Sequence, residues 1–117
     1  MKNFKKLEVW QRGIDIVKCA YELTKLLPNE EKYNLVSQIN RSAVSIPSNI
    51  AEGSSRKSEK DYFRFLEIAL GSCFELETQV IILNVLNFVS EEQTSEILNN
   101  IELQERQLFT FMNILNK

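Results

Sequence analysis

The side chains of this chain that could do chemistry are carboxylates and basic groups, because the sequence contains no histidine. That absence excludes Ser-His-Asp and Cys-His nucleophile systems and His-ligated zinc. Four glutamates remain as candidates for paired acid and base or for metal ligands: Glu52, Glu67, Glu75 and Glu77. Such carboxylates in helical proteins are more often solvated or salt-bridged than catalytic. The sequence therefore predicts a protein with no enzymatic activity, no cofactor and no metal.

Glycine and cysteine placement excludes further chemistry. The three glycines, Gly13, Gly53 and Gly71, are too few and too dispersed for a P-loop or a dinucleotide-binding fingerprint. Cys19 and Cys73 are far apart and belong to no CxxC pair, so we expect two buried thiols rather than a disulfide or a zinc site.

Basic residues supply the remaining candidate site, which would bind nucleic-acid phosphates. The five candidates surround one predicted turn: Arg41, Arg56, Lys57, Lys60 and Arg64. Contact would be with backbone phosphates rather than base edges, since the aromatic residues fall mostly on core positions. The alternative is a solvated basic turn that faces Glu59 and Asp61.

Charge is unevenly divided along the chain. Residues 1–57 contain ten Lys or Arg against six Asp or Glu, whereas residues 58–117 contain four against ten. The net charge of −2 thus conceals a basic first half and an acidic second half. This asymmetry predicts either a phosphate-binding face or pairing of the two halves within or between subunits.

Hydrophobic periodicity predicts four helices. The first runs from about Leu7 to Pro28, and the second runs from Leu35 to Gly53, where glycine could end it in a left-handed conformation. Ser58 is the predicted N-cap of the third helix, and a capping box at Ser90 opens the fourth. The third helix has a regular core seam: Tyr62, Leu66, Ala69, Cys73, Leu76, Val80 and Leu83.

The expected fold class is all-α, because no segment alternates as a half-buried strand does. Residues 1–117 should form a single domain, an antiparallel up-down-up-down four-helix bundle. No uninterrupted apolar run approaches the roughly 18 to 20 residues of a membrane span, and no secretory signal is evident. We expect a soluble, cytoplasmic protein without a membrane partner.

The second predicted helix carries an unusual polar stripe. Pro47 removes one helical hydrogen bond, so a bend is expected there. Small residues at the centre of the stripe would let another backbone approach closely, which favours a subunit interface with Arg41 and Glu52 as partners across it. The candidate interface residues are Gln38, Arg41, Ser45, Ser48, Asn49, Glu52, Gly71 and Ser72. The alternative is a bent helix with an ordinary solvated face.

The sequence resembles the four helix bundle proteins encoded in intervening sequences of bacterial large-subunit ribosomal RNA genes. The matching residues are Leu7, Val9, Trp10, Tyr21, Pro28, Leu35, Gln38, Arg41, the run SIPSNIAEG from Ser45 to Gly53, Phe63, Phe65, Leu66, Ala69, Gly71, Ser72 and the run ELETQ from Glu75 to Gln79. They span nearly all of the chain except the last predicted helix.

The resemblance implies an up-and-down bundle that assembles as a ring-like homopentamer. It also implies a relative that serves the reverse transcriptase of diversity-generating retroelements as an accessory protein and is associated with nucleic acid. Two departures remove positive charge: Asn40 and Leu70 stand where family members often carry arginine. Fewer basic side chains weaken attraction to phosphate.

Two functions are therefore expected. The first is a non-enzymatic homo-oligomer that associates with RNA or DNA through a symmetric basic surface. The alternative is a structural or adaptor oligomer that binds a protein such as a polymerase or reverse transcriptase.

Overall fold

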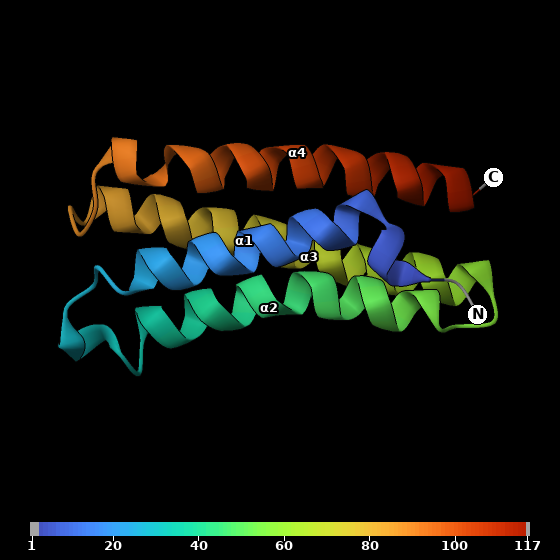
Figure 1. Cartoon of the computed structure of the whole chain (residues 1–117), viewed down its shortest axis with the longest axis horizontal. Helices are drawn as coiled ribbons and strands as arrows, with labels where there is room; N and C mark the ends of the chain where they lie inside the picture. Colours follow the sequence, from blue (N-terminus) through green and yellow to red (C-terminus); the bar gives the residue numbers. More distant parts are fainter. Residues whose placement is uncertain (1–2, 117) are drawn as a thin grey trace.

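Four antiparallel helices form the described part of the chain, residues 3–116 of a computed structural model. They are α1 (Glu8–Thr24), α2 (Leu35–Ser54), α3 (Glu59–Val85) and α4 (Glu91–Leu115), with short 3-10 turns η1 (Phe4–Lys6) and η2 (Asn29–Glu31). Successive helices run in opposite directions along one long axis (Figure 1). No strand occurs within residues 3–116, so the predicted all-α, up-down-up-down bundle is confirmed.

The predicted helix starts are confirmed by their caps. The Ser58 hydroxyl accepts a hydrogen bond from the Asp61 amide at 3.1 Å, which satisfies one of the free N–H groups at the start of α3. At the start of α4, the Ser90 hydroxyl accepts from the Gln93 amide at 3.1 Å. The Gln93 side chain accepts from the Ser90 amide at 2.9 Å, which completes the capping box.

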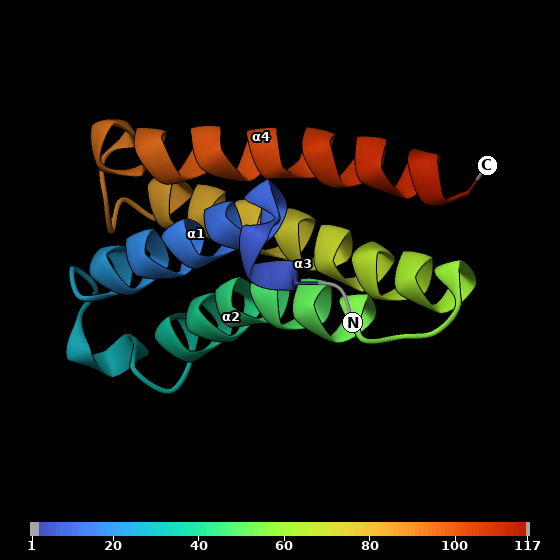
Figure 2. The same cartoon turned by 45° about the vertical axis from the view of Figure 1, so that its right-hand side comes forward.

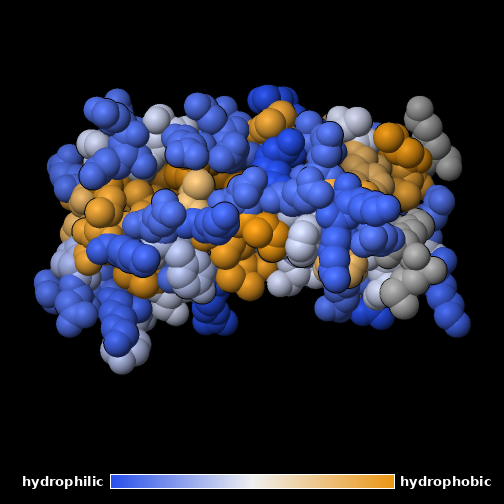
Figure 3. Space-filling view, viewed as in Figure 1, coloured by the Kyte–Doolittle hydropathy of each residue, from blue (hydrophilic) through white to orange (hydrophobic). Residues whose placement is uncertain are grey.

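One side of each helix supplies the core. All seven predicted core residues of α3 are buried, and they pack with the buried stripe of α1 that includes Ile16, Ala20 and Leu23. The neighbouring α1 stripe lies at the flank, where Ile14 and Tyr21 are exposed. On the face over α1, apolar side chains form separate areas among polar ones (Figure 3).

Gly53 does not end α2 as predicted. The helix continues to Ser54, and no glycine in the described residues has a positive φ. A Cβ added to Gly53 would lie 2.8 Å from Phe65 Cβ, so this glycine lets α3 approach α2 closely. The helix is also continuous through Pro47, which is buried and packs against Gly13 of α1.

Helix α3 corrects the expectation that no segment is long and apolar enough to span a membrane. Among the described residues it alone meets the criteria of length and composition, with a mean hydropathy of 1.4 over its best window. The sequence reading counted only uninterrupted apolar residues, whereas this window includes interspersed Ser, Thr and Gln. Core helices of bundles satisfy the same criteria, and the seam of α3 is buried against the other helices.

A buried glutamine joins α1 to α4. Gln104 is fully buried, and its Nε2 donates to the Val9 carbonyl at 2.6 Å. Its Oε1 accepts from Arg12 at 3.3 Å, and the same guanidinium donates to Gln107. The polar position Gln104 within the α4 seam is thus a hydrogen-bonded cross-link between α4 and α1.

We expect Gln104→Leu to lower the free energy of unfolding by about 2 kcal/mol, because it leaves buried polar groups of Val9 and Arg12 without this partner. Urea unfolding followed by circular dichroism measures the change. Gln107→Leu is the matched control, since water reaches that partly exposed position and can replace the lost acceptor. Equal losses in the two variants would contradict the cross-link.

Candidate nucleic-acid interface

Basic side chains from two separate segments lie in the same half of the bundle. Arg56 and Lys57 lie in the α2–α3 turn, and Lys60 and Arg64 lie in the first two turns of α3; all four are exposed. The η1 segment packs against α2 and, in Figure 1, lies in the same half of the bundle as this turn. Figure 2 shows it crossing the middle of α2. It adds the exposed residues Lys5 and Lys6.

We call the basic end the set Lys5, Lys6, Arg56, Lys57, Lys60 and Arg64. Sequence reasoning missed Lys5 and Lys6, because they are about fifty residues from the turn. A signal existed: in an antiparallel bundle the start of α1 lies beside the end of α2. This topology, combined with the basic first half of the chain, could have predicted that Lys5 and Lys6 lie near the second half of α2.

Arg41 does not join this end. It lies on α2, fifteen residues before Arg56, which corresponds to about 22 Å at the helical rise of 1.5 Å per residue. The prediction that all five basic residues surround one turn is therefore wrong for Arg41. Its place in sequence, on the preceding helix rather than in the turn, explains the difference.

Arg56 already has partners within its own subunit. Its guanidinium forms an ion pair with Glu52 at 2.8 Å and lies over the Phe65 ring, 4.6 Å from the centroid. Within residues 3–116, Lys57, Lys60 and Arg64 have no ion pair. Glu59 and Asp61 lie close by in the first turn of α3, so they offset part of the positive charge of this region in each copy.

The small polar residues of the candidate subunit interface partly serve the α2–α3 contact of one chain. The hydroxyls of Ser45 and Ser72 lie 2.8 Å apart, and Ser42 donates to Glu75 at 3.0 Å. Asn49 donates from its side-chain amide to the Ser45 carbonyl at 2.8 Å, within the same helix. Small side chains therefore allow a close contact here, but between two helices of the same subunit.

The other interface candidates remain on the outside. Gln38, Arg41, Ser48 and Glu52 are exposed on α2, and a Cβ added to Gly71 of α3 would meet no atom within 4 Å. Glu52 forms an exposed ion pair with Arg56 within the same subunit. An intersubunit role for these residues stays a prediction.

Two carboxyl groups meet between α3 and α4. Burial raises the pKa of Glu105 to about 8, and a hydrogen bond and charge repulsion from Glu77 add to the effect. Glu105 Oε2 is completely buried and has no hydrogen-bond donor from a neighbour in the described residues. Glu105 thus keeps its proton at neutral pH, which the sequence did not indicate.

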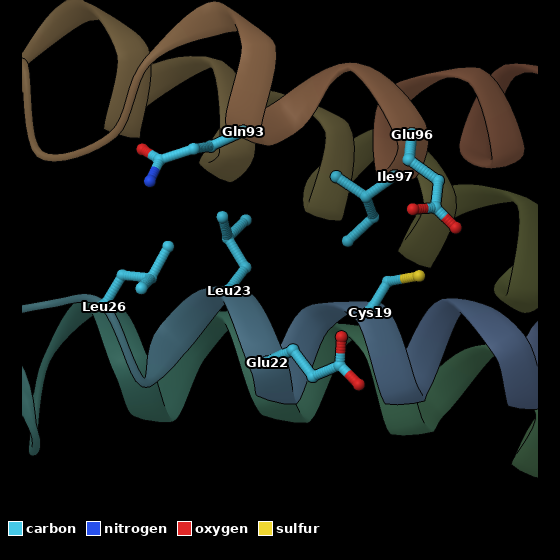
Figure 4. A pocket seen from close by; sticks show the side chains of 7 residues that line it. All are labelled: Cys19, Glu22, Leu23, Leu26, Gln93, Glu96 and Ile97. Atoms are coloured by element: carbon cyan, nitrogen blue, oxygen red, sulfur yellow. The ribbon is translucent and has the colours of Figure 1, made fainter.

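A cavity of about 190 Å³ separates the end of α1 from the start of α4. Figure 4 shows the Cys19 thiol pointing across it toward Ile97 and Glu96 of α4. Burial raises the pKa of this thiol, and the carboxylates of Glu96 and Glu22 raise it further. The thiol is therefore kept protonated and is a poor nucleophile.

Comparisons with known proteins agree with the geometry. The family model described as 23S rRNA-intervening sequence protein matches residues 5–110. A solved structure from Bacteroides thetaiotaomicron, a protein of unknown function from the S23 ribosomal protein family, is similar with a TM-score of 0.82 and 28% identity. The alignment covers 89% of this chain and 97% of that one. A search of curated proteins found no match.

The matched region includes α1, α2, α3 and most of α4, and the similar solved structure has the same arrangement of helices over nearly its whole length. The resemblance carried by the SIPSNIAEG and ELETQ runs is thereby confirmed. The chain belongs to the 23S rRNA-intervening sequence protein family.

Proposed function

We propose that the chain is a non-enzymatic, cytoplasmic homo-oligomer that associates with the phosphate backbone of RNA or DNA through its basic end. The observation that carries this proposal is the exposed group Lys57, Lys60 and Arg64 around the start of α3, with the exposed Lys5 and Lys6 of η1 in the same half of the bundle. Lys5 and Lys6 precede α1, whereas the other three residues follow α2. The fold therefore brings two basic segments that are distant in sequence into the same half of the bundle.

Assembly matters to this function because one copy is a weak site. The acids Glu59 and Asp61 offset two of the six positive charges of the basic end in each subunit, and Glu52 pairs with Arg56. A cyclic ring with its axis along the bundle, such as the homopentamer that the family resemblance implies, would place every copy of the basic end on one side. Several weak sites acting on one strand bind far more tightly than one.

Fluorescence anisotropy with a labelled single-stranded RNA tests the proposal. We expect affinity to fall about tenfold between 50 and 200 mM salt, because roughly three phosphate contacts release counterions. The double variant Lys57→Glu, Lys60→Glu should lose binding at all salt concentrations, since it reverses two exposed charges of the basic end. Duplex RNA and DNA of equal length determine which nucleic acid is preferred.

The matched control is the double variant Lys25→Glu, Lys32→Glu, which makes the same charge change at the opposite end of the bundle. It should bind nearly as the unmodified protein does. Binding that is indifferent to salt, or equally weakened by both double variants, would count against a basic-end interface.

A second candidate function is an adaptor that binds a protein partner, such as a reverse transcriptase, without touching nucleic acid. The observation in its favour is an apolar groove of about 550 Å³ between the start of α1 and the end of α4. It is lined by Leu7, Val9, Phe111 and Ile114, and Ile114 is largely exposed. The purified oligomer would then carry no nucleic acid and show no salt-dependent retention.

A further inference from the structure

The outward surface of α3 and α4 combines apolar rings with acids. We define the α3–α4 face as Phe74, Glu77, Ile81, Glu105 and Phe109. Phe74, Glu77 and Ile81 are spaced by three and four on α3, and Glu105 and Phe109 are spaced by four on α4, so each set shares one side of its helix. The contact between Glu77 and Glu105 joins the two sets.

This face is unusually apolar for a solvated surface. Phe74, Ile81 and Phe109 are 52%, 45% and 58% exposed, respectively. At its centre lies a buried carboxyl oxygen of Glu105 that receives no hydrogen bond within residues 3–116. An apolar surface around an acidic pair is complementary to a surface that presents a cation among small or apolar side chains.

The outer side of α2 has that composition. Arg41, Val44 and Ser48 recur at spacings of three and four, and all three are exposed. Arg41 has no ion pair within the described residues, because the neighbouring acid Glu52 is occupied by Arg56. We call Arg41, Val44 and Ser48 the α2 strip.

The two surfaces lie at the same height along the bundle. The Ser42–Glu75 hydrogen bond places Arg41 level with Glu75 and Leu76, and Glu77 is only about 3 Å further along α3 at the helical rise. Rotation about an axis parallel to the bundle leaves the height of every residue unchanged. In a ring with such an axis, Arg41 of one copy meets the Glu77–Glu105 pair of the next without any shift in register.

We propose that the α3–α4 face receives the α2 strip of a second copy of this chain, with Arg41 of that copy completing the Glu77–Glu105 site. The contact is heterologous, so repetition closes a ring. It pairs the basic first half of one subunit with the acidic second half of the next, which accounts for the uneven charge along the sequence. This inference rests on the proposed homo-oligomer and names its interface.

Multi-angle light scattering of charge variants tests the contact. We expect Arg41→Glu to reduce the mass toward that of one 13.6 kDa subunit, and Glu105→Arg to do the same. Arg41→Glu combined with Glu105→Arg should restore the oligomer, since the charges are exchanged. Lys18→Glu is the control, because it makes the same charge change at an exposed site of α1 outside both surfaces.

Circular dichroism establishes that each variant is folded. Should Glu105→Arg unfold, Phe109→Arg replaces it, because that side chain is 58% exposed and its loss opens no core cavity. An oligomer that survives both Arg41→Glu and Phe109→Arg overturns this inference but leaves homo-oligomerisation standing. An unmodified protein of one-subunit mass at micromolar concentration instead overturns the proposed oligomer itself.

Discussion

Replacement of Gly53 by alanine is expected to lower the free energy of unfolding by about 3 kcal/mol. The added Cβ would lie 2.8 Å from Phe65 Cβ and 3.0 Å from Tyr62 Cδ1. Phe65 Cβ is fixed to the α3 backbone, so rotation of the side chain cannot relieve the contact, and α3 must move away from α2. Thermal and urea unfolding followed by circular dichroism would measure the loss.

Two other glycines provide matched controls for the same chemical change. Gly71→Ala should raise the free energy of unfolding by up to about 1 kcal/mol, because alanine favours the helix and its Cβ meets no atom within 4 Å. The change in the free energy of unfolding for Gly13→Ala should lie between those of the other two variants, since the added Cβ would lie 3.2 Å from Pro47 Cβ. A Gly53→Ala variant as stable as Gly71→Ala would contradict the close α2–α3 contact.

Local features of the fold were predictable because the chain encodes them at short range. The Ser58 cap, the Ser90 capping box and the α3 seam each depend on residues within one or two helical turns. The apolar residues of α1 form two adjacent stripes along the helix, and the one with Ile16, Ala20 and Leu23 is buried. Periodicity could not show which of the two stripes faces the core, because that depends on where the other helices pack.

The candidate site was less predictable, because it depends on contacts between helices. Gly53 was interpreted as a helix end, but its use is a close approach to Phe65, which only the packing of α3 on α2 determines. Glu52 had two possible basic partners, and the helical spacing of four favours Arg56 over a residue of another subunit. Arg41 was therefore grouped with basic residues that lie about four helical turns away, and its pairing with Glu52 of another subunit stays a prediction.

The structure separates Arg41 from the other basic residues of the candidate site. Once Arg56 is paired with Glu52, the bundle presents two separate basic features, the basic end and Arg41. They lie about three to four helical turns apart along α2, so one can contact nucleic acid while the other contacts a neighbouring subunit. The separation means that variants at Lys57 and Lys60 should alter binding without altering assembly, and variants at Arg41 should first alter assembly.

The stability of the isolated subunit, in which no Arg41 of a second copy lies beside Glu105, should fall as pH rises from about 4.5 to about 8, apart from the effects of other groups. Glu105 has a pKa of about 8 in the folded chain, against an ordinary value of 4.5. Between these values the folded state holds a proton that the unfolded state has released, so raising the pH favours unfolding. Below about 4.5 both states are protonated, and above about 8 both are ionised, so the contribution is constant outside this window.

Glu105→Gln should remove this dependence and stabilise the protein at pH 8 to 9 by about 1 kcal/mol, a figure that allows for the access of water to the side chain. The amide keeps a donor for Glu77 and never ionises, so the repulsion between α3 and α4 at high pH disappears. Glu67→Gln is the control, because it removes an exposed carboxylate of α3 that is not among the groups raising the pKa of Glu105. Urea midpoints measured from pH 5 to 9 would test this dependence. If the midpoints of Glu105→Gln and of the unmodified protein changed with pH in the same way, Glu105 would not hold its proton in the folded chain.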